Sequence, residues 1–142
     1  MPGAVKMVDT FCDFEVMTIL VTGSGQASLL NGLDNDFPFA FPVNRRITSR
    51  NVQHGKPNPE PYIKALELSG LSPERAIVVE NAPLGIASGT SAGIFTVGVK
   101  TGPIPIENFY TAGADLVFNS MSEFAETLPR LLYILNNKNT NV

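Results

Sequence analysis

Short runs of β-branched and other apolar residues alternate along this chain with segments of helical periodicity. The clearest runs are residues 16–21, 76–79, 94–99 and 114–118. Such predominantly apolar runs are typical of strands covered on both faces, and the helical segments between them supply the crossovers that parallel strands require. The alternation therefore predicts an α/β fold with a parallel sheet.

Composition narrows the class of protein further. A chain of 142 residues that is 44% hydrophobic is long enough for one domain with a core of its own. Ten Lys and Arg against thirteen Asp and Glu give a net charge of −3, which offers no basic field for nucleic acid or a membrane surface. The sole cysteine, Cys12, and sole histidine, His54, exclude intramolecular disulfides and zinc sites built from thiolates or paired imidazoles. With no signal peptide or membrane span in the sequence, we expect a cytoplasmic protein.

Helical patterns occupy the connections between the expected strands. One helix is expected over residues 26–33. Another begins after Asn58, with Pro59 at its first position, and ends at Gly70. Its apolar stripe consists of Tyr62, Ile63 and Leu66. A weak strand is expected near residues 47–48, between these two helices.

Two more helices are expected, one opening at Pro83 and one over residues 122–135. One face of the last helix is apolar, which packing against the sheet explains; its members are Phe124, Leu128, Leu131, Leu132 and Leu135. A further apolar group, expected to cover the core, consists of Phe37, Phe39 and Phe41. We assign residues 1–135 to the domain and the Asn-rich residues 136–142 to a disordered tail.

Polar groups follow two of the expected strands and occupy one loop between them. Thr22, Gly23 and Ser24 bring hydroxyls and flexible amides to the start of a helix, an arrangement suited to an anion. Lys56 is a cation on a proline-rich loop, and Glu80 is a hard oxygen donor of the kind that Mg²⁺ prefers. Because ligands of parallel sheets bind at the carboxyl ends of the strands, these groups predict a phosphate and magnesium site. Each group by itself also fits an ordinary turn, a surface lysine or a helix cap.

Two other sites fit less well. A dinucleotide site would need a third glycine where Ser28 stands, and a carboxylate near Val43. A serine hydrolase using Ser24 and His54 would need glycine in place of Thr22. We therefore interpret His54 as an exposed loop residue.

Three ordered segments resemble motifs of the haloacid dehalogenase-like hydrolases, in particular the β-phosphoglucomutase-like branch of sugar-phosphate phosphatases and mutases. Residues 21–26 (VTGSGQ) resemble the second motif, a strand ending in a phosphate-binding Thr or Ser. Residues 55–62 (GKPNPEPY) resemble the third, whose lysine neutralises the charge of phosphate and nucleophile. Residues 78–85 (VVENAPLG) resemble the fourth, whose acidic residues hold Mg²⁺.

The resemblance implies a set of site residues and a substrate class. Phosphate binding falls to Thr22, Gly23, Ser24 and Lys56. Lys56 would also be catalytic, and Mg²⁺ would be held by Glu80 and Asn81. Since Asn81 stands where many relatives carry Asp, Glu80 is the sole anionic ligand, and we expect weak Mg²⁺ binding. The implied substrate is a small phosphorylated metabolite.

One motif of the family has no match. Its first motif is an apolar strand ending in Asp-x-Asp, whose first Asp attacks phosphorus while the second acts as acid and base. Here the chain begins in what resembles the helix before the second motif. Its one Asp-x-Asp, at residues 34–36, follows no strand, and we interpret it as an accidental match in a loop. We therefore expect an incomplete core domain, a three-layer, Rossmann-like parallel sheet flanked by helices that lacks the family's first strand and its cap.

The unmatched strand has consequences for fold and function. By the family's topology this strand would lie between the strands ending at Thr22 and Glu80. Without it, we expect the inner edges of those two strands to pair directly, to stay apart, or to bind a partner chain or peptide. We interpret the chain as a truncated product: a shortened gene model, a splice form or a decayed copy. Two functions stay open. One is a phosphatase or phosphomutase core with little or no activity, and the other is a non-catalytic phosphate-binding or regulatory module.

Overall fold

Parallel strands and flanking helices make up the fold in the computed structural model, which describes residues 2–140, with side chains described to residue 137. One sheet has the order β1-β2 and the other the order β3-β4-β5, and each of these pairings is parallel. The strands are β1 (Leu20–Val21), β2 (Arg46–Ile47), β3 (Ile77–Glu80), β4 (Phe95–Val99) and β5 (Leu116–Phe118). The predicted α/β, Rossmann-like class is confirmed.

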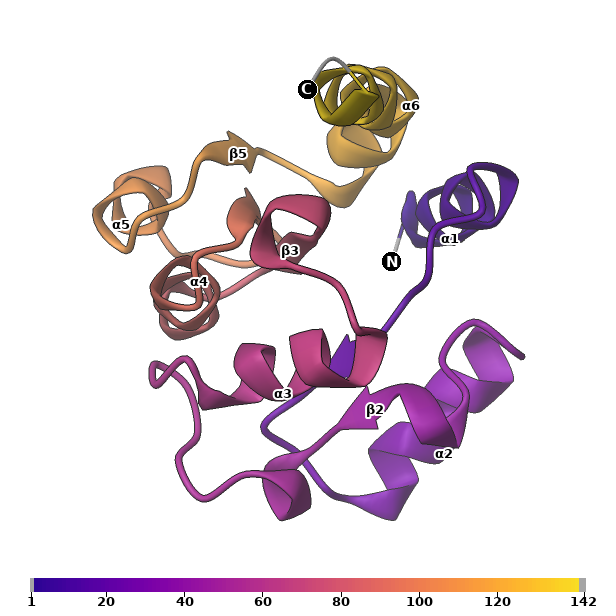
Figure 1. The fold of residues 1–142 in the computed structure, drawn as a ribbon, viewed down its shortest axis with the longest axis vertical. Coiled ribbons are helices and arrows are strands. Elements are labelled where there is room, and N and C mark those ends of the chain that lie inside the picture. The colour runs from indigo at the N-terminus through magenta and orange to yellow at the C-terminus, as the bar shows by residue number, and fades with distance from the viewer. Residues whose placement is uncertain (1, 141–142) are drawn as a thin grey trace.

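The helices cover the strands from two sides (Figure 1). α1 and α6 lie side by side against one face of the three-stranded sheet, whereas α4 packs against β3 and β4, and α5 against β5. α3 contacts both strands of the smaller sheet. The helices are α1 (Ala4–Asp13), α2 (Ala27–Asp36), α3 (Glu60–Ser69), α4 (Pro83–Ser91), α5 (Ile106–Thr111) and α6 (Met121–Thr140). Short 3₁₀ turns span Val43–Arg45, Ser49–Asn51 and Pro73–Arg75.

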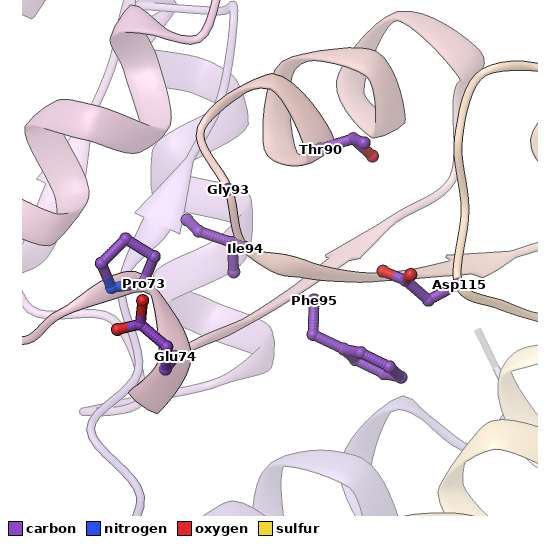
Figure 2. A pocket seen from close by; sticks show the side chains of 7 residues that line it. All are labelled: Pro73, Glu74, Thr90, Gly93, Ile94, Phe95 and Asp115. Carbon is purple, nitrogen blue, oxygen red and sulfur yellow. The ribbon is translucent and has the colours of Figure 1, made fainter.

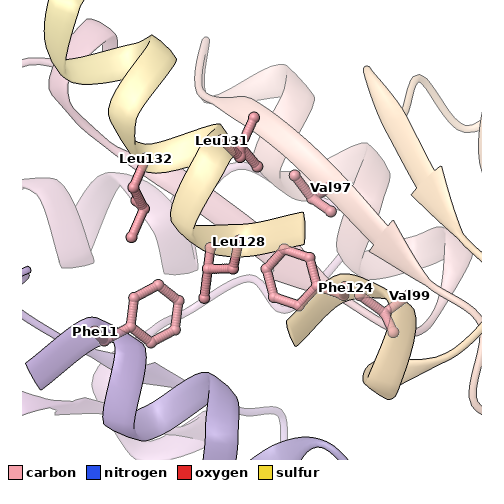
Figure 3. Close-up of a cluster of buried hydrophobic side chains, with 7 residues drawn as sticks. All are labelled: Phe11, Val97, Val99, Phe124, Leu128, Leu131 and Leu132. Carbon is pink, nitrogen blue, oxygen red and sulfur yellow. The ribbon is translucent and has the colours of Figure 1, made fainter. Parts of the chain in front are cut away.

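Two apolar clusters lie on opposite faces of the three-stranded sheet. The larger one joins α1, β4 and α6 (Figure 3) and consists of Phe11, Val97, Val99, Phe124, Leu128, Leu131 and Leu132. The smaller one lies between α3 and β3 and consists of Tyr62, Val78 and Ile94. Val79 packs against the larger cluster and its neighbour Val78 belongs to the smaller one, as expected for successive strand residues. The predicted apolar face of α6 is thereby confirmed.

The two sheets remain separate within the described residues. β1 and β3 each have a strand neighbour on one side only. A cavity of about 730 Å³ lies between them, lined by residues of both strands and of α1, α3 and α6. Of the outcomes considered for the inner edges, direct pairing of β1 with β3 is thus contradicted.

The first expected strand is shorter than its sequence suggests. Residues 16–21 were expected to form it, but only Leu20–Val21 pair, with Arg46–Ile47 of β2. The backbone groups of a strand need hydrogen-bond partners. On one side β2 supplies two paired residues, and on the other side lies the cavity. Apolar, β-branched composition is therefore not sufficient to make the rest of this segment a strand.

Several helical boundaries also differ from expectation. α2 continues beyond residue 33 to Asp36, so residues 34–36 are helical and their interpretation as a loop was wrong. α6 continues past Leu135 to Thr140, into the Asn-rich segment, while residues 141–142 lie outside the described part. α3 ends at Gly70 as predicted, where a left-handed backbone (φ 70°) closes it. α5 was not predicted.

Two aromatic and apolar assignments to the core were wrong. Phe39 is 95% exposed and Ile63 of α3 is exposed, although Tyr62 beside it is buried. Phe41 does line the cavity.

Over residues 2–140, none of the helices combines the length and hydropathy of a membrane span.

Candidate active site

Side-chain hydroxyl groups of the loop after β1 accept hydrogen bonds from backbone N–H groups nearby in the chain. Thr22 N–H donates to Ile47 O at 2.9 Å, which extends the pairing of β1 with β2 by one residue. The Thr22 hydroxyl accepts from Ser24 N–H at 3.1 Å, and the Ser24 hydroxyl accepts from Gln26 N–H at 3.2 Å. These side-chain turns lead the chain from the carboxyl end of β1 into the first turn of α2.

Lys56 joins the carboxyl ends of the two sheets. Its ammonium donates to the carbonyl of Val21 at 3.2 Å and pairs with the carboxylate of Glu80, the last residue of β3. It also lies 5.4 Å from the centre of the Tyr62 ring. The side chain is only 20% exposed, so its charge is held at the edge of the protein interior.

The loop that carries Lys56 is fastened at two points. The carboxylate of Glu60, in the first turn of α3, accepts from the backbone N–H groups of Gln53 and His54, both at 2.8 Å. These bonds lower the pKa of Glu60. Ser88 of α4, which is fully buried, donates to Asn58 O at 2.6 Å. The His54 side chain is exposed, as predicted.

Glu80 is a buried carboxylate with two partners. Besides Lys56, it accepts a hydrogen bond from the Tyr62 hydroxyl at 2.5 Å. Burial, and then the charge of Glu80, raise the pKa of Tyr62, so the phenol stays protonated and donates. Gly85 of α4 makes room for this carboxylate, because a Cβ there would lie 2.1 Å from the Glu80 carboxyl carbon.

The residues assigned to Mg²⁺ do not by themselves form a metal site. Glu80 is paired with a cation, and the Asn81 amide donates to the Thr101 hydroxyl at 3.1 Å. No group of three His, Cys, Asp or Glu side chains that could hold a metal occurs in the described part of the chain. One carboxylate beside an ammonium is a poor donor set for Mg²⁺, which needs carboxylate charge to offset its dehydration.

Most of the predicted site residues lie at one end of the cavity. Those that line it are Thr22, Gly23, Lys56, Glu80 and Asn81. Ser24 does not line the cavity. Sequence reasoning missed Tyr62, Gly85 and Thr101, and also Arg50, whose Nε lies 3.5 Å from the position a Cβ would take on Gly25. Arg50 therefore adds a second cation beside the loop after β1.

The Asp-x-Asp of α2 lies apart from this site. Asp34 pairs with the guanidinium of Arg46, and neither Asp34 nor Asp36 lines the cavity. Its interpretation as an accidental match agrees with this placement.

A second, more open cavity of about 410 Å³ lies at the amino ends of β3 and β4 (Figure 2). Its acidic side chains serve the fold. Asp115 accepts from Thr96 N–H at 2.8 Å, and the backbone amide of Glu74 lowers the pKa of the Glu74 carboxyl. Since ligands of parallel sheets bind at the carboxyl ends, this cavity is not a candidate site.

Comparison with known families agrees with the motifs. A family model described as haloacid dehalogenase-like hydrolase matches residues 1–99. The chain belongs to the haloacid dehalogenase-like hydrolases.

Several of the matched relatives are named as phosphatases. Hexitol phosphatase A of Escherichia coli is 35% identical over 81 residues, which are 57% of this chain and 36% of that protein. Glycerol-1-phosphate phosphohydrolase 1 of Saccharomyces cerevisiae is 33% identical over an alignment of 107 positions that covers 70% of this chain and 42% of that protein.

Solved structures of the family superpose on nearly the whole chain. A Bacteroides vulgatus protein provisionally named a β-phosphoglucomutase has a TM-score of 0.89 and 41% identity, over 95% of this chain and 54% of its own. CbbY of Rhodobacter sphaeroides in complex with phosphate has a TM-score of 0.73 and 23% identity, over 87% and 55%, and shows the fold alone. The resemblance to the β-phosphoglucomutase-like branch is confirmed. The chain spans 36–55% of the length of these four proteins.

Proposed function

We propose that this chain binds the phosphate group of a small phosphorylated metabolite at the carboxyl ends of β1 and β3, and that by itself it hydrolyses such compounds slowly or not at all. The observation that supports binding is the position of Lys56, whose ammonium reaches both strand ends and lies in the same cavity as Thr22 and Gly23. A sugar phosphate is the substrate class we infer from the family.

The charges of the site favour an anion that can compete with Glu80 for Lys56. A phosphate dianion at the loop after β1 would receive the ammonium of Lys56 and lie near Arg50. The hydroxyl of Thr22 and the backbone of Gly23 supply polar groups without charge. We assign Lys56 the neutralisation of phosphate charge, and Thr22 with Gly23 its positioning.

Low activity is inferred from the carboxylates of the site. Covalent phosphoryl transfer needs a carboxylate free to attack phosphorus. At the carboxyl ends of the strands, Glu80 is the one acid among the described residues that line the cavity, and it is already paired with Lys56 and Tyr62. Positioning and charge neutralisation by Lys56 remain, without a nucleophile to position.

Binding is tested by titration calorimetry with inorganic phosphate and glucose 6-phosphate. We expect about millimolar affinity, and a loss of at least about tenfold in Lys56→Met, which keeps the length of the side chain but removes its charge. Lys64→Met is the matched control, because Lys64 is an exposed cation of α3 that lies 3.9 Å from Glu67 and away from the cavity. Equal affinity in both variants would contradict the assignment of Lys56.

Turnover is measured on the same samples with p-nitrophenyl phosphate, with and without added Mg²⁺. The proposal predicts binding without hydrolysis above the rate of a heat-denatured sample. Hydrolysis that disappears in Lys56→Met and persists in Lys64→Met would instead show an active phosphatase, the other function that the family allows.

A further inference from the structure

Tyr62 belongs both to the apolar core and to the candidate site. Its ring is buried in the smaller cluster, with Val78 and Ile94. Its hydroxyl donates to Oε1 of Glu80, the same oxygen that accepts from the ammonium of Lys56. Because a phenylalanine ring would fill the same space in the core, the hydroxyl has its effect where it bonds, at the carboxylate.

The carboxylate of Glu80 depends on these two donors. Its side chain is 9% exposed, and a buried charge is stable only when it is paired or hydrogen-bonded. Gly85 of α4 lies against the carboxylate and has no side chain to offer it. Over the described residues, the side chains that bond to Glu80 are therefore one cation, Lys56, and one neutral hydroxyl, that of Tyr62.

A bound phosphate would share Lys56 with Glu80. An ammonium has three N–H donors, and Lys56 uses two of them on the Val21 carbonyl and on Glu80. A phosphate dianion beside Thr22 would attract the ammonium and bring a second negative charge toward Glu80. Lys56 would then offset less of the Glu80 charge. The Tyr62 hydroxyl, carried by a buried ring, would keep its bond to the carboxylate.

We propose that Tyr62 is a positioning residue of the phosphate site, whose hydroxyl holds the Glu80 carboxylate in place while Lys56 binds the anion. The role rests on the phosphate site proposed above. In the free chain Glu80 is paired with the cation and the hydroxyl, and in the phosphate-bound chain it depends mainly on the hydroxyl. Tyr62 therefore stabilises the bound state more than the free state, and that difference raises the affinity for phosphate.

Tyr62→Phe tests this role, because it removes the hydroxyl and keeps the ring, which lies 5.4 Å from the ammonium of Lys56. Affinity for inorganic phosphate is measured from amide chemical shifts of the ¹⁵N-labelled chain. We expect Tyr62→Phe to bind phosphate about tenfold more weakly than the wild type. Tyr110→Phe is the matched control, because Tyr110 of α5 is exposed and does not line the cavity, and its affinity should be unchanged. Equal affinity in the wild type and Tyr62→Phe would overturn the inference.

A double-mutant cycle with Glu80→Gln separates this role from packing. Glutamine leaves Lys56 without a carboxylate to share, so Glu80→Gln should bind phosphate more tightly than the wild type. It also leaves no charge for the Tyr62 hydroxyl to hold. Adding Tyr62→Phe to this variant should therefore change the affinity by less than about twofold. A tenfold loss in both backgrounds would show that Tyr62 acts through packing, and would overturn the inference.

The wild-type chain carries a spectroscopic signature that needs no substitution at Glu80. With ¹³C-labelled glutamate, the carboxyl carbon of Glu80 should change its chemical shift as phosphate is added, because Lys56 is drawn away from it. The change should saturate at the same phosphate concentration as the amide shifts. A Glu80 carboxyl shift that stays constant while the amide shifts saturate would overturn the inference, since Lys56 would then not be shared.

The same experiment distinguishes this role from the site on which it rests. A wild-type chain that binds no phosphate would overturn the phosphate site, and the role of Tyr62 with it. A wild-type chain that binds phosphate no better than Tyr62→Phe would overturn the role of Tyr62 and leave the site in place.

Discussion

Replacing Phe124 by alanine should lower the free energy of unfolding by about 3–5 kcal/mol. Phe124 is fully buried in α6, in the centre of the larger cluster, with its ring centre 5.3 Å from that of Phe118. Alanine would leave a void among Val97, Val99 and Leu128 that helix and sheet cannot close. Urea unfolding followed by circular dichroism measures the change.

The control for this variant lies on the same helix. Tyr133 is 65% exposed, so Tyr133→Ala should change the free energy by less than about 0.5 kcal/mol. Domains of this size are stable by about 5–15 kcal/mol, so Phe124→Ala removes a large share of the total. A loss below about 1 kcal/mol would show that α6 does not hold the sheet as described.

The second large effect is expected at Glu80. Glu80→Gln keeps the shape of the side chain and an acceptor for the Tyr62 hydroxyl, but leaves the mostly buried ammonium of Lys56 without a counter-charge. Removing one partner of a buried pair typically costs about 3–5 kcal/mol, and we expect about 3 kcal/mol because Lys56 retains some access to water and the Val21 carbonyl.

A double-mutant cycle assigns this loss to the pair. Adding Lys56→Met to Glu80→Gln removes the unpaired charge and should restore most of the stability. Glu67→Gln is the matched control, because Glu67 is exposed and lies 3.9 Å from Lys64, a surface pair worth less than about 0.5 kcal/mol. If the double variant is as unstable as the sum of the single ones, Lys56 and Glu80 are not coupled.

The parts of the fold that local sequence determines could be predicted. Gly70 ends α3, Glu80 ends β3, and the apolar face of α6 packs against β4, because each depends on backbone preference or on the spacing of residues within one element. The motif residues Thr22 and Lys56 likewise fall at the expected strand end and loop.

Features that depend on a distant partner could not be predicted. Residues 16–19 are apolar enough for a strand, but they pair with no strand among the residues that the structure describes. Tyr62 fits an apolar stripe, and nothing near it in the sequence shows that its hydroxyl reaches Glu80, eighteen residues away. Arg50 lies beside Gly25 because β1 pairs with β2. The local sequence pattern does not encode that pairing.

The central claim is that an anion site lies where β1, β3 and the Lys56 loop meet. Titration of the ¹⁵N-labelled chain with inorganic phosphate, followed by amide chemical shifts, tests it most directly. We predict saturable shifts confined to Gly23, Ser24 and the residues around Lys56 and Arg50, and their loss in Lys56→Met. Shifts that are absent, or that cluster instead at the open cavity around Thr90 and Asp115, would contradict the claim.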